Sequence, residues 1–417
     1  MFDRHWRRRL ALAFICLPII ACTRDPGVSP HPPMPAADDA PAASAYRHAS
    51  EPIGTVRQIY DGTLYPDTQA NTFRNIDRLF PTRTVAKGET VRDLPPSYYP
   101  LEDFKLTIDD EVYDLYDIIS LNRVSGLIVL KDGETAFEGY FLGNDRNTRW
   151  MSMSVVKSMT AMLIGAAIHD GHIKSIDDPI VDYIPNFKDT AYDGVTVRHL
   201  LQMSSGVAWN ETYTDRRSDR RRMLEAQISQ QPGAIFDLMA KLPRAAEPGT
   251  RWNYSTGETH IAGLLVAVAT GKPLAEYLSE KIWSKAGMED DANWWLEAPG
   301  GLEVGGSGLS ATLRDYARFG LFMLEDGMIG NERILPEGWM AEASSRQVIN
   351  GETVDYGYML WPLHGNSYAA VGIFGQIVFV DPDLNLVVAM WGAQPKPLGK
   401  EGVDEYLFLE ALSKHFR

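Results

Sequence analysis

Ser154 and Lys157 are the residues whose types and spacing point most directly to chemistry. They stand three residues apart at the start of a long apolar run, 155–168. If that run is a helix, three residues are about one turn, so the hydroxyl and the amine share a face. A serine becomes a nucleophile when a neighbouring base takes its proton, and a lysine can be that base if burial lowers its pKa. The pair predicts the reaction centre of a serine hydrolase.

A bare Ser-x-x-Lys pattern is weak evidence, because a chain of this length contains roughly one by chance. The alternative is a serine at a helix N-terminus with a lysine on the surface. The apolar neighbours of Lys157 argue against a surface position, and the run 155–168 is apolar on every side, as in a helix buried in a core. This context favours a buried pair.

Tyr254 is the second candidate for a catalytic residue. Ser255 and Glu258 predict a capping box that opens a helix, with Tyr254 just outside the cap. A tyrosine there could be a hydrophobic staple, but its partner position holds Thr259, which is polar. The hydroxyl is then left at a positive helix end, where a phenolate would be favoured.

The elements that must position these residues follow from periodicity and turn signals. An Asp-Gly turn joins two strands, and the C-terminal third is rich in strands. We expect strands at 126–131, 135–142, 356–361, 368–372, 377–380 and 386–391, and helices at 155–168, 226–242, 313–325 and 407–416. Strands at both ends with helices between them indicate one sheet built from distant parts of the chain, an α+β architecture.

Composition narrows the function further. The chain has 417 residues, 45% hydrophobic and 23% charged, which suits a globular enzyme. Its net charge of −15 argues against a nucleic-acid partner. The cysteines are Cys16 and Cys22, so the mature chain would have no disulfide and no cysteine-based metal site. We expect no metal and no cofactor.

The N-terminus reads as an export signal. Arginines precede an apolar stretch, 10–20, that is too short to span a bilayer. The signal ends in Ile-Ile-Ala-Cys at Cys22, which resembles the lipobox of bacterial lipoproteins. That resemblance implies lipidation of Cys22 and a periplasmic location in a Gram-negative envelope, with Thr23 favouring the outer membrane. The alternative is an ordinary signal peptide with an incidental cysteine.

These observations divide the chain into four parts. Residues 1–21 are a lipoprotein signal peptide, and 22–52, rich in Pro, Ala, Ser and Asp, are a flexible tether. Residues 53–116 are an N-terminal extension without a clear period. Residues 117–417 are the hydrolase domain, and its oligomeric state is left open.

Three stretches together resemble the penicillin-recognising serine hydrolases, which comprise class C β-lactamases, D-peptidases and related esterases. They are Ser154-Val155-Val156-Lys157, Tyr254-Ser255-Thr256 and Gly372-Ile373-Phe374-Gly375-Gln376. The resemblance implies an antiparallel sheet flanked by helices, a mostly helical subdomain, and an active site between them. It also implies that Ser154 is the nucleophile, that Lys157 and Tyr254 form its base, and that the backbone N–H groups of Ser154 and Ile373 form an oxyanion hole.

Within that family the chain looks most like 6-aminohexanoate-dimer hydrolases and their esterase relatives, through Met203-Ser204-Ser205-Gly206-Val207 and the following Trp209, Glu211 and Tyr213. The implied substrate-binding residues are Tyr213, Trp209, Gly372, Phe374 and Gly375. Tyr213 would meet the amide nitrogen of a substrate, or else form a pocket wall.

Two departures separate the chain from class C β-lactamases. Thr256 replaces the asparagine of their tyrosine motif, and a Lys-Thr-Gly tripeptide is absent. The resulting expectation is a hydrolase that cleaves a small carboxylic ester or amide through an acyl-enzyme on Ser154. The alternatives are a β-lactamase or D-peptidase acting on peptidoglycan-like substrates, and a non-catalytic binding module of the same fold.

Overall fold

The computed structural model describes residues 46–97, 99, 101, 103–399 and 402–417. The predicted signal peptide, Cys22 and most of the predicted tether lie outside these residues. The last part of the tether lies within them and is packed: the Tyr46 hydroxyl donates to the Arg74 carbonyl oxygen at 3.0 Å, and Arg47 pairs with Asp145 at 2.8 Å. The packed chain therefore includes residues before the expected boundary at 53.

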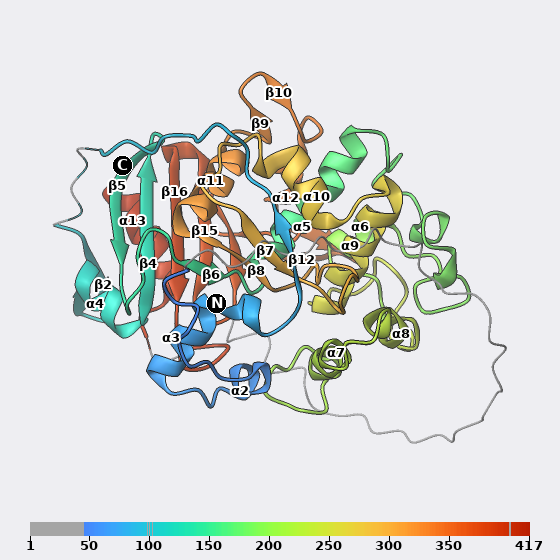
Figure 1. The fold of residues 1–417 in the computed structure, drawn as a ribbon. Coiled ribbons are helices and arrows are strands. Elements are labelled where there is room, and N and C mark those ends of the chain that lie inside the picture. Colours follow the sequence, from blue (N-terminus) through green and yellow to red (C-terminus); the bar gives the residue numbers. More distant parts are fainter. Residues whose placement is uncertain (1–45, 98, 100, 102, 400–401) are drawn as a thin grey trace. The chain divides into compact units, whose positions relative to one another are not determined.

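The helices and strands are labelled in Figure 1. The helices are α2 (Val56–Asp61), α3 (Pro66–Arg74), α4 (Leu115–Leu121), α5 (Val155–His169), α6 (Val197–Leu201), α7 (Asp219–Ile228), α8 (Ala234–Ala240), α9 (Thr256–Thr270), α10 (Leu274–Leu278), α11 (Leu313–Leu324), α12 (Trp339–Ala343) and α13 (Glu405–His415). The strands are β1 (Thr82–Val85), β2 (Lys105–Ile108), β3 (Glu111–Asp114), β4 (Val124–Lys131), β5 (Glu134–Tyr140), β6 (Arg149–Met151), β7 (Ala292–Trp295), β8 (Leu309–Thr312), β9 (Met328–Ile329), β10 (Glu332–Arg333), β11 (Gln347–Ile349), β12 (Glu352–Val354), β13 (Trp361–Pro362), β14 (Tyr368–Gly372), β15 (Gln376–Asp381) and β16 (Leu386–Gly392).

The main sheet is antiparallel, with strand order β13-β14-β15-β16-β4-β5. In Figure 1 the teal strands β4 and β5 lie beside the red strands of the C-terminal third. Asp132 and Gly133, with φ of 54° and 81°, form the tight turn between β4 and β5. This pairing of distant segments confirms the predicted α+β architecture.

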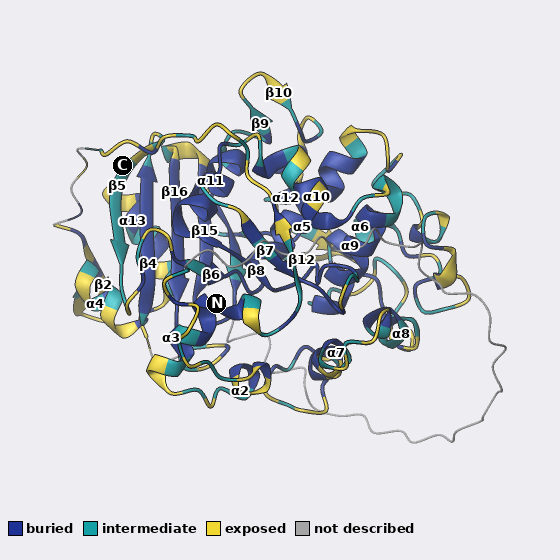
Figure 2. Ribbon diagram, in the orientation of Figure 1, coloured by how far each residue is buried: buried dark blue, intermediate teal, exposed yellow. Residues whose placement is uncertain are grey.

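Both faces of this sheet are covered. Along β4, Ile128 and Leu130 face the core that contains α5 and α11, while Leu127 and Val129 face a second core that contains Phe408 of α13. The alternation follows from the two-residue period of a strand. Figure 2 shows β4, β15 and β16 buried, whereas the edge strand β5 is half-buried.

A smaller antiparallel sheet, in the order β1-β7-β8-β6, supports the start of α5. Its strand β6 ends at Met151, three residues before Ser154, so the sheet places that serine. Helix α5 packs against α9, and both are buried along most of their length. In the described part of the chain, no single helix is long and apolar enough to cross a membrane; one bent pair, Thr256–Thr270 with Leu274–Trp283, meets the length and composition criteria.

Two predicted elements are wrong. The single helix at 226–242 is two helices, because Pro232 and Gly233, with φ of 75° at the glycine, interrupt it between α7 and α8. The residues predicted to form a strand at 356–361 form a turn instead, and among them only Trp361 lies in a strand, β13. The Gly357 N–H bonds to the Leu360 carbonyl oxygen at 2.9 Å, which folds the segment back on itself.

Candidate active site

Ser154 and Lys157 form a buried pair at the N-terminus of α5. The Lys157 Nζ donates to the Ser154 Oγ at 2.9 Å and to the Gly306 carbonyl oxygen at 2.7 Å. Lys157 is 1% exposed to solvent, whereas Ser154 is 8% exposed. The expected shared face is confirmed, and the surface-lysine alternative is wrong.

The pKa of Lys157 is lowered to about 7, mainly because burial disfavours the ammonium. The negative charge of Glu211 opposes this shift, and the positive charge of Arg220 adds to it. A substantial fraction of Lys157 is therefore a neutral amine near pH 7. Such an amine, within hydrogen-bond reach of a hydroxyl, can act as a general base.

A tight backbone turn brings the chain from β6 to α5. Met153 has a φ of 41°, in the left-handed region that residues other than glycine rarely adopt. The Val155 N–H closes the turn on the Ser152 carbonyl oxygen at 3.1 Å. Ser154 consequently takes the N-cap position of α5 without using its side chain as a cap, and its hydroxyl stays available to Lys157.

Tyr254 lies beside this pair, immediately before the N-cap of α9. Its ring stacks on Trp361 at 5.8 Å and meets the edge of Tyr356 at 5.9 Å, and the Lys157 Nζ lies 5.3 Å from the ring centre. Burial, with the charge of Glu211, raises the pKa of Tyr254, and a hydrogen bond with Ser154 opposes that rise. Tyr254 is therefore protonated at neutral pH, because burial outweighs the positive helix end that would favour a phenolate.

The predicted capping box of α9 is half formed. Ser255 accepts from the Glu258 N–H at 3.1 Å, but the Glu258 carboxyl turns away and accepts from the Ser205 hydroxyl. Glu211 takes part in capping instead, accepting from the Thr256 N–H at 2.9 Å and from the Thr256 hydroxyl. A carboxylate is well suited to this positive helix end.

Gly372 brings the two residues of the expected oxyanion hole, Ser154 and Ile373, close together. Gly372 ends β14, and a Cβ on it would lie 2.7 Å from the Ser152 carbonyl oxygen and 2.9 Å from the Ser154 nitrogen. Only glycine allows this close approach. Within the described residues, neither the Ser154 nor the Ile373 backbone N–H donates a hydrogen bond. Both are therefore free to bind a carbonyl oxygen.

Phe374 and Gly375 do not bring side chains to this site. Phe374 is fully buried in the core against Phe73, with ring centres 5.2 Å apart, and has a φ of 69°. Gly375, with a φ of 85°, packs against Gly392. The structure contradicts the substrate contact predicted for Phe374, because the left-handed turn points its ring into the protein. Both residues shape the turn that holds Ile373.

Trp209 and Tyr213 lie on the loop that faces the start of α9. Trp209 packs over Gly257 and donates through Nε1 to Glu211. Tyr213 is buried, and it lies close enough to Tyr254 and Glu211 for both to raise its pKa. Glu211 joins these groups, and its role was not recognised in the sequence. The available signal was its place between the two aromatic residues of this loop.

A glycine-rich loop before β8 supplies a second contact that sequence reasoning missed. The Gly306 carbonyl oxygen accepts from Lys157, and the Gly305 carbonyl oxygen accepts from the Thr160 hydroxyl at 2.8 Å. A Cβ on Gly305 would lie 2.7 Å from the Thr259 carbonyl oxygen. Glycines let this loop pass between α5 and α9, and the run of glycines was the signal for it.

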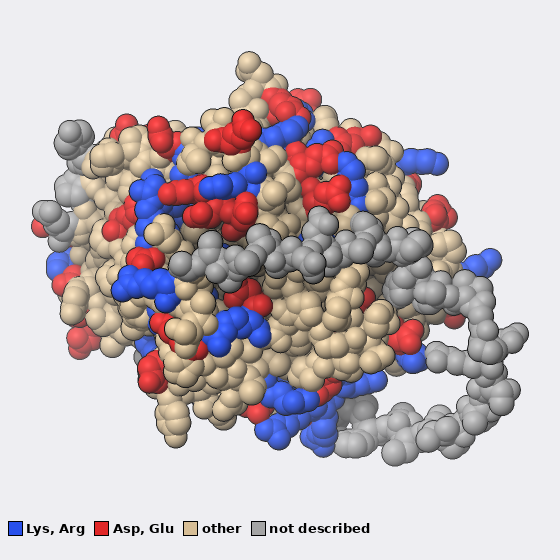
Figure 3. Space-filling model, viewed as in Figure 1, with Lys and Arg blue, Asp and Glu red and all other residues tan. Residues whose placement is uncertain are grey.

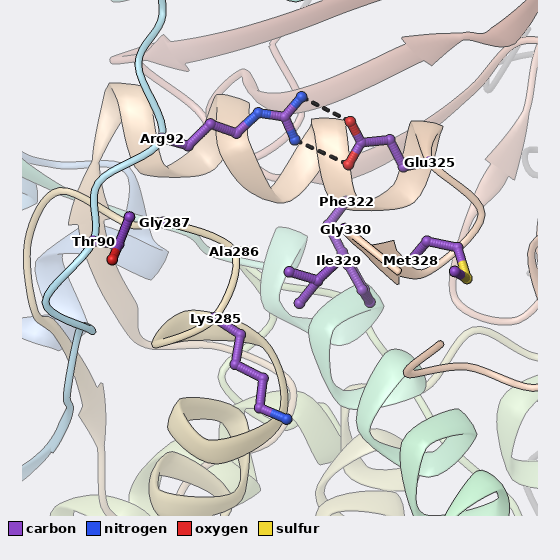
Figure 4. Close-up of a pocket in the computed structure, with 10 residues that line it drawn as sticks. All are labelled: Thr90, Arg92, Lys285, Ala286, Gly287, Phe322, Glu325, Met328, Ile329 and Gly330. Carbon is purple, nitrogen blue, oxygen red and sulfur yellow. Dashed lines mark hydrogen bonds and ion pairs between the residues drawn. The ribbon is translucent and has the colours of Figure 1, made fainter. Parts of the chain in front are cut away.

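A separate pocket of about 160 Å³ is drawn in Figure 4. None of its lining residues belongs to the Ser154 site. Its charged groups are paired, Arg92 with Glu325 at 2.7 Å and Lys285 with Glu332 at 2.6 Å, so it offers no free charge to a ligand. Over the ranges that the structure describes, no group of three or more His, Cys, Asp or Glu side chains is placed to hold a metal ion.

Comparisons with known proteins show what this chain is similar to. The family model described as Beta-lactamase matches residues 122–413. A 6-aminohexanoate-dimer hydrolase from Paenarthrobacter ureafaciens is 26% identical over 342 residues, covering 78% of this chain and 85% of that protein.

Two solved structures share the fold. One, from Bacillus anthracis and provisionally named a 6-aminohexanoate-dimer hydrolase, has a TM-score of 0.74 at 21% identity, covering 84% of this chain and 92% of that one. The other, a family VIII carboxylesterase, has a TM-score of 0.54 at 18% identity, covering 70% of this chain and 92% of that one.

Proposed function

Because the chain belongs to the β-lactamase family of serine hydrolases, we propose that it cleaves carboxylic ester or amide bonds through an acyl-enzyme on Ser154. The observation that carries this proposal is the buried Lys157 amine, 2.9 Å from the Ser154 hydroxyl and with a pKa of about 7. A neutral base in contact with a hydroxyl is what activation of a serine requires.

In the acylation step, Lys157 accepts the Ser154 proton as the Oγ attacks the substrate carbonyl carbon. The carbonyl oxygen becomes an oxyanion that the N–H groups of Ser154 and Ile373 stabilise, and such a donor is commonly worth about 3 kcal/mol of barrier. Tyr254 is protonated and hydrogen-bonded with Ser154, so it can donate its proton to the departing alcohol or amine. Lys157 returns a proton to Tyr254 as the leaving group departs.

Deacylation reverses these roles. Water attacks the acyl carbon while the Tyr254–Lys157 pair accepts its proton, and the Ser154 Oγ leaves with a proton from the same pair. The same oxyanion donors serve both steps, since both pass through a tetrahedral intermediate. The chemistry needs only side chains and backbone groups already in place.

A small linear ester or amide is the substrate class that the site supports best. The Thr256 hydroxyl and N–H are both bound to Glu211, so Thr256 is not available for a substrate in the way the resemblance implies for the asparagine of class C β-lactamases. Tyr213, which lies near Tyr254, is the residue we propose for contact with a substrate amide nitrogen or as a wall of the pocket. The named activity of the Paenarthrobacter relative, on a 6-aminohexanoate dimer, supports this choice.

The test is a substrate panel assayed with wild-type protein and Ser154→Ala. The panel contains p-nitrophenyl esters, linear amides, D-amino peptides and nitrocefin. We expect turnover of esters or linear amides that Ser154→Ala abolishes. Equal rates in both proteins would refute the proposal, and a preference for nitrocefin or D-amino peptides would replace this substrate class with the β-lactamase or D-peptidase alternative.

The proposed location is the periplasmic side of an outer membrane, with a lipid on Cys22. The sequence supports it through the export signal and the lipobox-like Ile-Ile-Ala-Cys. In a Gram-negative host, the wild-type protein should take up labelled palmitate and sediment with outer membranes, whereas Cys22→Ser should do neither. A soluble, unlabelled wild-type protein would contradict the anchor and leave the catalytic proposal intact.

A further inference from the structure

Helix α2 of the N-terminal extension ends in two residues that hold two consecutive arginines of α7. Arg220 donates to the Tyr60 hydroxyl oxygen and lies over its ring, 4.4 Å from the centre. The next arginine, Arg221, donates to Asp61 at 2.8 Å. Tyr60 and both arginines are almost fully buried, so the Tyr60–Arg220 contact is shielded from water. Asp61 is partly exposed and also pairs with Arg216 on the surface.

Each arginine then contacts the loop that faces the catalytic tyrosine. The Arg220 Nε lies 3.9 Å from a Glu211 carboxylate oxygen, and Arg221 donates to the Tyr213 carbonyl oxygen at 3.1 Å. Two parallel chains of contacts thus run from the extension to the site. One passes from Tyr60 through Arg220 to Glu211, and the other from Asp61 through Arg221 to Tyr213.

Glu211 connects the first chain to the chemistry. It accepts from the Thr256 N–H and hydroxyl at the start of α9, directly after the Tyr254 segment. Its negative charge raises the pKa of Lys157 and of Tyr254, while the charge of Arg220 lowers both. The position of Arg220 relative to Glu211 therefore affects the proton affinity of the catalytic pair.

We propose that α2 is a working part of the active site, in which Tyr60 and Asp61 are positioning residues. Tyr60 holds Arg220 against Glu211 and so places the start of α9, and Asp61 holds Arg221 against the backbone of Tyr213 and so places the substrate-facing loop. This inference rests on the proposed function, because it assigns roles relative to the Ser154 chemistry. According to this inference, the N-terminal extension helps to position the groups that carry out catalysis.

The interface between α2 and α7 also contains a contact that does not reach the site. Arg57 pairs with Glu225 at 2.6 Å, and both side chains are about half exposed. Figure 3 shows basic side chains gathered on the surface over these two helices. If α2 served only to cover α7, exposed pairs of this kind would suffice, since burying Arg220 and Arg221 incurs a desolvation cost. Arg57 is therefore the matched control.

The experiment compares Tyr60→Phe, Asp61→Asn and Arg57→Gln in the full chain, with the best substrate of the panel. Tyr60→Phe keeps the ring but frees Arg220 from its hydroxyl, so we expect kcat/KM to fall at least about tenfold. The acid limb of the pH profile should move to higher pH, because Arg220 no longer sits firmly where it lowers the pKa of Lys157. Asp61→Asn should raise KM at least about fivefold, with a smaller change in kcat. Arg57→Gln should match wild type.

Thermal unfolding of all four proteins separates positioning from folding. Activity losses that follow Tm, with no movement of the pH limb and no rise in KM, would give α2 a structural role and overturn the inference. Wild-type rates in Tyr60→Phe and Asp61→Asn would overturn it as well. Both results leave an active wild-type enzyme, whereas a wild type inactive toward the whole panel would refute the proposed function itself.

Discussion

Replacing the buried lysine with an apolar side chain of similar length should stabilise the protein while destroying its activity. The pKa of Lys157 is about 7 in the folded chain, against an ordinary value of 10.5 for a lysine in the unfolded chain. The unfolded chain therefore binds more protons between those values, so this group makes stability rise with pH through that window. At about 1.4 kcal/mol per tenfold change in proton affinity, the penalty is ~5 kcal/mol at pH 6 and ~2 kcal/mol at pH 9.

Lys157→Met removes that penalty at every pH. The increase in the free energy of unfolding over wild type should therefore be ~3 kcal/mol larger at pH 6 than at pH 9. The loss of the hydrogen bonds to Ser154 and Gly306 is common to both pH values and cancels in this difference. Urea unfolding of both proteins at the two pH values measures it.

The control for this experiment is Lys174→Met, at an exposed position, which should show no such pH dependence. A stability difference between Lys157→Met and wild type that is the same at pH 6 and pH 9 would refute the reasoning. It would mean that the ammonium is not disfavoured by burial, and that Lys157 is not a neutral base near pH 7.

Three further changes test the rest of the site. Tyr254→Phe should lower ester turnover at least about a hundredfold through lost proton transfer, and a near-normal rate would remove Tyr254 from the mechanism. Glu211→Gln should move the acid limb of the pH profile roughly half a unit or more to lower pH, because Glu211 raises the pKa of Lys157; a shift to higher pH would contradict this. Gly372→Ala places a Cβ 2.9 Å from the Ser154 nitrogen and should lower kcat at least about a hundredfold. A change in KM with kcat unchanged would contradict this prediction.

Local patterns predicted the Ser154–Lys157 pair well, because the two residues are close in sequence. The Ser154–Lys157 pair needs one helical turn, and the apolar run that forms α5 is continuous. Tyr254 was placed correctly outside its cap for the same reason. Its protonation state could not be predicted from the sequence, because it depends mainly on burial, which the position at a helix end does not reveal.

The omissions came from contacts between distant residues, whereas the errors came from local backbone features. Tyr60 and Arg220 are 160 positions apart, and nothing local to either predicts their contact. Phe374 follows a residue of the site, but one left-handed φ turned its side chain into the core. Pro232 and Gly233 were visible in the sequence, yet the surrounding apolar pattern was given more weight than two helix-breaking residues.

In the proposed mechanism, Ser154 forms the covalent acyl-enzyme. The most direct measurement is intact-mass analysis after incubation with a fluorophosphonate, followed by peptide mapping of the modified residue. We predict a single adduct on Ser154 of the wild-type protein at pH 8, much slower labelling in Lys157→Met, and none in Ser154→Ala. An adduct on another residue, or equal labelling of Ser154→Ala, would contradict the account.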